Sequence, residues 1–411
     1  MNDRDLARIR SLAAHQMELA QSDANIKLVE LWKKHNMCRG ERPMIHIETG
    51  TFAREVLDPQ LQCEDPFARA IERNLIDACI NLELYNDDKA VPPYYQMRWN
   101  TRFELFGHEI KETVLHNSDG VETGHIIEHI IEDLEEDFDK ILMPSEMSVN
   151  KAATLEQMEK VNEAIGDILP VKLVSDCLYA VPTQKIVRMM GMENMFCAMY
   201  EYPELFMQMM ERVGDAYLAY FDLLEKENVL MQTRGFEWLA QGSFAFYDEP
   251  DKEGPIKSTD VWGFLDSQET VGVSPAMFHE FIFPCYARIA ERFGRLSYGC
   301  CEPVHTFWND IKTLPNLKKV SISPWCDEEF MADKLRGSST IYHRKPSPNY
   351  LGIGTALDEE AFRKHIDKTV TTARGCTLEI AQRDVYTVNR DIKKVRRYVE
   401  IIRESIDKNW R

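Results

Sequence analysis

The sequence contains no run of apolar residues long enough to cross a membrane, which takes about 20 of them in succession. The segment at its start, MNDRDLARIRSLAAHQMELA, is charged and amphipathic and lacks the apolar core of a signal peptide. These two absences predict a cytoplasmic protein. In such a protein we expect the ten cysteines to be reduced thiols.

Positive charge is scarce as well. The 49 Lys and Arg residues are outnumbered by 68 Asp and Glu residues, which gives a net charge of −19. Because nucleic acids and anionic membranes attract basic surfaces, we expect neither as a partner. The acidic balance also disfavours a polyanionic substrate, unless a local basic pocket exists. A small molecule is therefore the expected ligand.

No internal repeat and no low-complexity linker divides the 411 residues. Apolar residues at helical spacing predict a helical extension over residues 1–40. Over residues 41–411, predicted strands alternate with helices, which indicates a parallel sheet, and eight strands suggest a (β/α)8 TIM barrel with inserted loops. The predicted strands lie near Met44, Val91, Val171, Val261, Leu296, Val320, Thr340 and Thr377. We expect one barrel per chain without an independent second domain, and a homodimer stays open.

Three stretches fall outside this alternation. Residues 101–125 are expected to form an antiparallel excursion with a turn at 117–120, and residues 126–141 an acidic amphipathic helix. The pattern His125-Ile-Ile-Glu-His129 matches inverted zinc peptidases, but five residues are a weak signal and the helix face explains them better. The aromatic residues of 229–258 are expected either to cover the site or to pack in the core.

The most reactive stretch is LSYGCCEPVH, residues 296–305. It reads as a buried strand that ends in two thiols, an acid and a histidine, and a barrel places its chemistry at that end of its strands. Strand alternation would put Cys301 on the inner side and Cys300 on the outer side. Cys326 follows the next predicted strand in the same way. Most free cysteines are small buried hydrophobes, but this pair beside Glu302 and His305 favours a metal or catalytic role.

Other stretches resemble the uroporphyrinogen decarboxylase superfamily. They are the run DSQETVGVSPAMFHEFIFPCY from Asp266, the sequence VPT from Val181 leading to MGME at Met190, and EYPEL from Glu201 with its long helix. The resemblance covers about residue 150 to the C-terminus. It implies a (β/α)8 barrel and three kinds of activity: metal-free decarboxylation of uroporphyrinogen, zinc-dependent methyl transfer involving corrinoid proteins or a thiol, and methionine synthesis without cobalamin.

Within this superfamily the sequence is closer to the zinc-dependent corrinoid methyltransferases. The decarboxylases end their N-terminal strand in an arginine motif that holds the substrate carboxylates, whereas this strand ends in His46-Ile-Glu48. Uroporphyrinogen is therefore not expected as a substrate. The methyltransferases carry His-x-Cys at the strand matching Leu296–Cys301. Cys301 matches the cysteine, but Gly299 stands at the histidine position.

The resemblance therefore implies zinc held by Cys301 and Cys326, completed by Glu269. Thiolates and a carboxylate suit zinc with one position open for substrate. Glu302, His305, Glu379 and Asp384 stay open as further ligands. We expect the corrinoid to be carried by a partner protein.

Polar groups at other predicted strand ends complete the candidate site. Asp266, His46 and Glu48 are candidate catalytic residues, and His343, Arg383 and Trp238 are candidate substrate-binding residues. His343 begins a basic run, His343-Arg344-Lys345, near the expected mouth. The first function predicted is zinc-dependent transfer of a methyl group between a small methylated compound and a corrinoid protein or thiol acceptor. The alternatives are a metal-independent decarboxylase of a small carboxylate and a ligand-binding barrel without catalysis.

Overall fold

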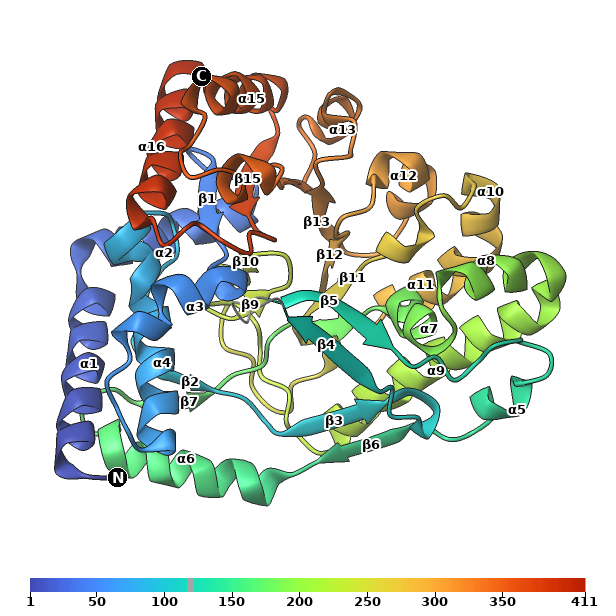
Figure 1. Ribbon diagram of the computed structural model, residues 1–411, viewed down its shortest axis with the longest axis horizontal. Helices are drawn as coiled ribbons and strands as arrows, with labels where there is room; N and C mark the ends of the chain where they lie inside the picture. Colours follow the sequence, from blue (N-terminus) through green and yellow to red (C-terminus); the bar gives the residue numbers. More distant parts are fainter. Residues whose placement is uncertain (117–121, 411) are drawn as a thin grey trace.

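The computed structural model describes residues 1–116 and 122–410 and shows a mixed α/β protein built on parallel strands (Figure 1). Seven of them form one sheet whose neighbours follow chain order. The strands, in sheet order, are β1 (Met44–Ile47), β15 (Thr377–Gln382), β14 (Ile341–Arg344), β13 (Leu317–Ile322), β12 (Arg295–Tyr298), β11 (Trp262–Leu265) and β8 (Leu178–Ala180). This order is the one a barrel-like α/β fold requires.

A further parallel pair extends the arrangement. β2 (Tyr95–Met97) pairs with β7 (Val171–Leu173), and β7 runs into β8 after the short stretch 174–177. Strands therefore occur at all eight predicted positions. Through β7, the chain connects this pair directly to β8, the edge strand of the seven-stranded sheet.

Helices connect successive strands along the chain (Figure 1), and the longer ones bury one face, as does α16 (Ile392–Asn409) after the last strand. In α16, for example, the buried residues Val395, Tyr398, Val399, Ile402 and Ile406 recur at helical spacing. The helices between the strands are α7 (Pro182–Met190), α8 (Met192–Glu201), α9 (Pro203–Lys226), α10 (Pro275–Met277), α11 (Phe283–Ala290), α12 (Trp308–Ile311), α13 (Glu328–Leu335), α14 (Asn349–Gly352) and α15 (Glu359–Thr372).

The N-terminal segment is helical, as predicted. α1 (Asp3–Gln21) begins where the Asn2 side chain accepts a hydrogen bond from the Asp5 amide, and it packs on α4 (Pro66–Ile80) and α6 (Lys151–Ile165). α2 (Asp23–Asn36) lies against the strands instead. The Trp32 indole, fully buried, donates to the Asp88 carbonyl oxygen at 2.6 Å.

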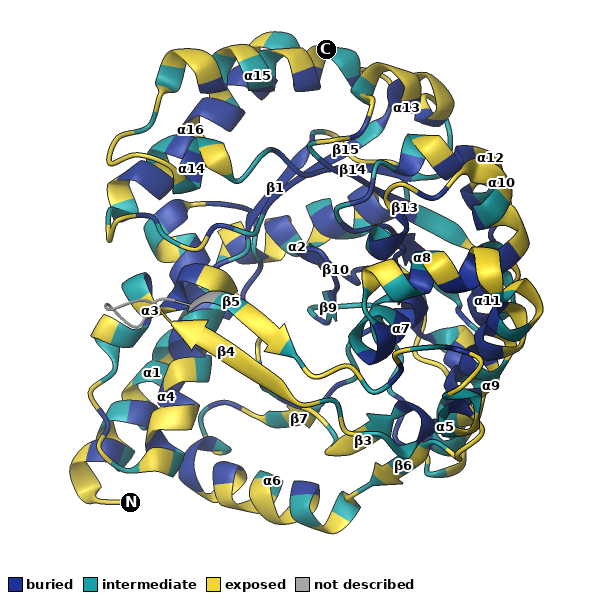
Figure 2. Ribbon diagram, turned by 45° about the vertical axis from the view of Figure 1, so that its right-hand side comes forward, coloured by how far each residue is buried: buried dark blue, intermediate teal, exposed yellow. Residues whose placement is uncertain are grey.

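Part of the stretch 229–258 packs inside the protein next to the parallel strands and does not cover the expected mouth of the barrel. It contains the hairpin β9 (Trp238–Leu239) and β10 (Ser243–Phe244), which lies inside the ring of helices in Figure 2. The Asn36 side-chain amide donates to the Phe244 and Phe246 carbonyl oxygens at 2.9 and 2.8 Å, which fixes the hairpin on α2. Phe244 and Phe246 therefore belong to the core, whereas Trp238 is only partly buried.

The hairpin extends from the middle of the parallel strands to their carboxyl ends. Ser243 Oγ accepts from Lys319 Nζ, on β13, at 2.6 Å. Gln241 Oε1 accepts from Lys345 Nζ, just beyond β14, also at 2.6 Å. Gln241 and Gly242 turn the chain with positive φ values of 69° and 77°, which glycine adopts without steric cost. The hairpin tip thus forms part of the floor at the carboxyl ends of the strands.

The region 101–149 departs from one prediction. Its antiparallel pairs are β3 (Thr101–Glu104) with β6 (Glu146–Val149), and β4 (Glu112–His116) with β5 (Glu122–Ile127). The helix predicted over 126–141 is wrong, since that stretch holds the end of β5 and only the short α5 (Phe138–Ile141). The predicted turn at 117–120 lies outside the described residues. In the described part of the chain, no helix is long and apolar enough to span a membrane.

Candidate active site

A cavity of about 430 Å³ lies at the carboxyl ends of the parallel strands, where barrel enzymes hold their substrates. Much of its polar and sulfur-bearing lining comes from segments that follow four of the parallel strands and from the hairpin tip. These residues are Asp266 and Gln268 after β11, Cys300 and Cys301 after β12, Lys345 after β14, Arg383 and Asp384 after β15, and Gln241 at the hairpin tip.

Both thiols of the vicinal pair line this cavity. Their Sγ atoms are 3.6 Å apart, and Cys301 Sγ lies 4.0 Å from Asp384 Oδ2. The expectation that Cys300 faces outward is wrong, because β12 ends at Tyr298 and Gly299, with φ 99°, breaks the strand alternation. A Cβ at position 299 would lie 3.0 Å from Val304 Cγ1. Histidine therefore does not fit there.

The two thiols differ in acidity. The hydrogen bond from Cys300 lowers the pKa of Cys301 to about 7, against the effect of burial, and the Lys345 cation lowers it further. The same hydrogen bond, together with burial, raises the pKa of Cys300. Cys301 is therefore the thiol that ionises near neutral pH.

Glu302 holds the loops after β11 and β12 together. Its fully buried carboxylate accepts hydrogen bonds from the amides of Ser267 and Cys300 at 2.9 and 2.8 Å. These bonds place the thiol pair next to the loop that carries Asp266. Because its oxygens accept these hydrogen bonds, Glu302 holds the two loops together rather than serving as a metal ligand.

Asp266 follows β11 directly and is 1% exposed. Its Oδ1 atom is buried and has no hydrogen-bond partner among the described residues. Burial raises the pKa of this carboxyl well above its ordinary value, and the charges of Glu302 and Glu269 raise it further. Asp266 can therefore hold a proton at the cavity wall, as a general acid requires.

Two basic groups share the cavity. Lys345 is 2% exposed and donates to Gln241. Arg383 lies with its Nε atom 3.1 Å from Asp384 Oδ1 and 3.6 Å from Glu48 Oε2. Of the basic run at 343–345, only Lys345 lines the cavity, because Arg344 turns outward to Glu328 and His343 faces the interior.

The predicted zinc ligands do not come together. Cys326 packs in the large hydrophobic cluster and does not line the cavity. Glu269 Oε2 accepts from the Thr183 hydroxyl at 2.9 Å, and its Oε1 accepts from Gln268. Among the residues that the structure describes, no three His, Cys, Asp or Glu side chains are placed to hold a metal ion.

The vicinal thiols fit zinc better than the predicted set does. Tetrahedral coordination with Zn–S bonds of roughly 2.3 Å places two sulfur ligands about 3.8 Å apart, close to the 3.6 Å between Cys300 and Cys301. The corresponding sulfur–oxygen separation is roughly 3.5 Å, so Asp384 lies slightly too far away. Two thiols and a nearby carboxylate are a donor set that zinc accepts.

His46, Glu48 and Trp238 line a neighbouring cavity of about 330 Å³ at the end of β1. The His46 Nδ1 atom is 2.9 Å from the Gly242 carbonyl oxygen at the hairpin tip. Contact between Glu48 and Arg383 connects this cavity to the thiol site. The three residues therefore border the thiol site without lining it.

His343 and Glu379 belong to a buried interior network. Glu379 Oε2 pairs with Lys319 Nζ at 2.7 Å, and the nearest His343 nitrogen is 3.9 Å from the same carboxylate. Burial lowers the pKa of His343 to about 3, which keeps the imidazole neutral. His305 lies outside the cavity too, with its Nδ1 atom accepting from the Asp327 amide.

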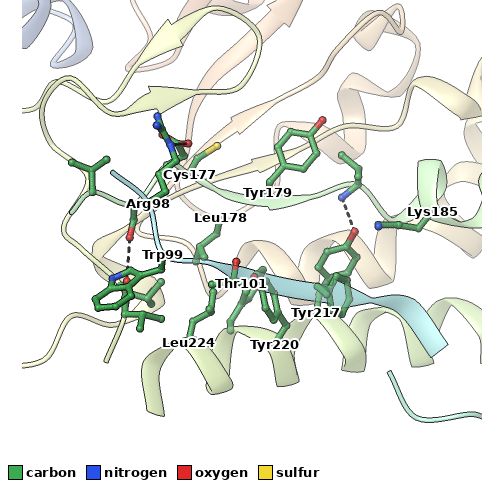
Figure 3. Close-up of a pocket in the computed structure, with 18 of the residues that line it drawn as sticks. Arg98, Trp99, Thr101, Cys177, Leu178, Tyr179, Lys185, Tyr217, Tyr220 and Leu224 are labelled. Atoms are coloured by element: carbon green, nitrogen blue, oxygen red, sulfur yellow. Dashed lines mark hydrogen bonds and ion pairs between the residues drawn. The ribbon is translucent and has the colours of Figure 1, made fainter. Parts of the chain in front are cut away.

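A third cavity, of about 440 Å³, adjoins the thiol site through Tyr179 and Gln184, which line both. Figure 3 shows the aromatic residues Trp99, Tyr179, Tyr217 and Tyr220 in its lining, the last two from α9. The Tyr217 hydroxyl accepts from the Val181 amide at 3.1 Å. This cavity lacks the convergent thiols and carboxylates of the thiol site.

The comparison with solved structures finds a methyltransferase from Methanosarcina mazei, with a TM-score of 0.51. The match covers 93% of this chain and 98% of that chain, at 11% sequence identity. No family model and no curated protein matches the sequence. At this identity the match shows a shared fold along nearly the whole of both chains.

Proposed function

We propose that the protein is a methyltransferase that moves a methyl group from a small methylated substrate to a corrinoid protein or a thiol. The observation that carries the proposal is the pair of convergent thiols, 3.6 Å apart, beside a buried Asp266 in the cavity at the strand ends. The fold shared with a methyltransferase supports the same activity.

In this proposal Cys300 and Cys301 would hold zinc, with Asp384 as the nearest carboxylate. Bound zinc would supply Lewis acidity toward the substrate heteroatom. Asp266 donates its proton to the oxygen, nitrogen or sulfur that leaves as its bond to the methyl carbon breaks. The acceptor, a Co(I) corrinoid or a thiolate, provides the electron pair for the new bond. Arg383 orients the substrate at the mouth.

The test combines metal analysis with methyl transfer to free cob(I)alamin, using methanol, methylamine and 4-methoxybenzoate as donors. We expect zinc in protein purified without added metal and methylcobalamin formation with at least one donor. Cys300→Ser and Cys301→Ser should each lose zinc and transfer. Cys326→Ser, the matched control outside the cavity, should keep both. Equal activity in all three cysteine variants would overturn the proposal.

A second function, decarboxylation of a small carboxylate, is favoured by one observation: Asp266 and Lys345 line the same cavity. Asp266 could protonate the carbon that loses CO2 while Lys345 holds the carboxylate before it leaves. Loss of CO2 from a small carboxylate, unchanged in Cys301→Ser and abolished in Asp266→Asn, would select this function. The third possibility, a protein that only binds its ligand, requires that the wild-type protein turns over none of these donors.

A further inference from the structure

Lys345 is a buried cation without an acidic partner. Its Nζ atom makes one hydrogen bond, to Gln241 Oε1, and no Asp or Glu oxygen of the described chain lies within 4.0 Å of it. An ammonium group has three N–H donors, so two remain for other acceptors. Because a buried charge is costly unless it is paired, this arrangement points to an anionic ligand.

The unused hydrogen-bond donors around the cavity indicate which kind of anion fits. Arg383 is already compensated by Asp384 and Glu48, and its Nη1 atom is buried without a hydrogen-bond partner. Arg383 can therefore add a hydrogen bond without demanding a further counter-charge. Lys345 likewise has N–H donors that no group of the described residues accepts from. A carboxylate has two oxygens, so it can accept a hydrogen bond from each of the two side chains.

The rest of the lining suits an apolar ring. Tyr179, Pro324, Trp325, Pro346 and Pro348 surround the opening. Trp325 is 74% exposed and Tyr179 is 45% exposed, which is unusual for large aromatic side chains unless they contact a ligand or partner. The volume of about 430 Å³ accommodates a ligand of one ring with small substituents.

We propose that the thiol site binds a small aromatic carboxylate, whose carboxylate group lies between Lys345 and Arg383 and whose ring contacts Tyr179 and Trp325. Its assignment as the methyl donor, for example as a methoxy-substituted ring, rests on the methyltransferase function proposed above. The anchoring itself depends only on the charges and shape of the cavity. Asp266, with its unpartnered Oδ1, lies in the same lining and faces the bound ligand.

Calorimetric titration of the full-length protein tests the anchoring without any substitution. Benzoate should bind, and benzamide, which has the same shape and no charge, should bind at least about tenfold more weakly. Benzenesulfonate and inorganic phosphate distinguish other anions. Tighter binding of either than of benzoate would overturn the carboxylate assignment, and so would equal affinity for benzoate and benzamide.

Variants then locate the site. Lys345→Met should weaken benzoate binding at least about tenfold and leave benzamide unchanged. Lys312→Met, at an exposed lysine, should leave both unchanged. Wild-type affinity for benzoate in a folded Lys345→Met variant would overturn the proposal.

The outcome is separable from that of the proposed function. Methylcobalamin formed from methanol, without any benzoate binding, would leave the methyltransferase standing and overturn the aromatic carboxylate. Benzoate bound through Lys345, with no methyl transfer from any donor, would support the carboxylate site and overturn the methyltransferase.

Discussion

The Nζ atom of Lys319 lies 2.7 Å from Oε2 of Glu379, and both side chains are fully enclosed by the protein. Lys319 also donates to Ser243 of the β9–β10 hairpin, so this ion pair joins β13 and β15 to the segment that fills the interior. Burial opposes ionisation of Glu379, but the charge of Lys319 together with the side chains of His343 and His35 outweighs burial and holds the pKa of Glu379 well below its ordinary value. Burial also lowers the pKa of Lys319, and the charge of Glu379 opposes that effect, so each group depends on the other for its charge.

Breaking this pair should destabilise the protein strongly. Lys319→Met leaves Glu379 buried without its cation and should lower the free energy of unfolding by about 3–5 kcal/mol. The double variant Lys319→Met, Glu379→Leu removes both charges and should recover much of that loss. Urea denaturation measures both. Lys368→Met is the control, because its ion pair with Glu329 is exposed and such pairs contribute at most about 1 kcal/mol. If Lys319→Met is as stable as Lys368→Met, the prediction is wrong.

The hairpin tip gives a second prediction. Gly242 has φ 77°, and a Cβ there would lie 3.3 Å from Ala381 Cβ and 3.4 Å from His46 Nδ1. In Gly242→Ala, backbone strain should lower the free energy of unfolding by roughly 1–2 kcal/mol. The new Cβ should also displace the hairpin tip from the site. Gly337→Ala is a matched control, since Gly337 has φ 68° and open space around it. Thermal unfolding should show a larger loss for Gly242→Ala, and only this variant should weaken ligand binding. Equal losses would show that the tip is not tightly packed.

Strand alternation with helices was enough to place all eight strand positions, because buried parallel strands are short apolar runs bounded by turn residues. The details of the thiol site depended on backbone conformations that composition does not reveal. From its sequence context, Gly299 is predicted to lie in a strand. Its positive φ ends the strand alternation, so Cys300 lines the cavity instead of facing outward. The hairpin at 238–244 is another example. Its aromatic residues suit either a lid or a core, and only the contacts of Asn36 and Lys319 distinguish the two.

The cysteines should differ sharply in reactivity. Hydrogen bonding from Cys300 lowers the pKa of Cys301 to about 7, whereas burial raises the pKa of Cys326 to about 12. In metal-free protein, alkylation of Cys301 by iodoacetamide should accelerate as the pH rises through about 7 and then level off. Cys326 should stay unmodified while the protein is folded. Peptide mass spectrometry measures each site, with the exposed Cys197 as the control for reagent access. Faster modification of Cys326 than of Cys301 would reverse the placement of these two thiols.

Asp266 gives the prediction that connects stability with function. Burial raises the pKa of its carboxyl well above the value of about 3.9 expected in the unfolded chain. A raised pKa in the folded state contributes stability that is complete below the unfolded value and is lost as the pH rises through the folded value. Each unit of pKa difference corresponds to about 1.4 kcal/mol. Asp266 therefore lowers the free energy of unfolding at neutral pH, and Asp266→Asn removes this loss.

We expect Asp266→Asn to be more stable than the wild type at pH 8 and to show a smaller difference at pH 4.5, while losing turnover at both. Urea denaturation at the two pH values measures the change. Asp248→Asn, at an exposed aspartate, is the control for removing a carboxyl without removing burial. Subtracting the wild-type curve cancels the titration of the groups that do not interact with Asp266, because they are common to both proteins. A difference that shrinks as the pH rises would mean that Asp266 is ionised in the folded state, and its role as a proton donor would then fail.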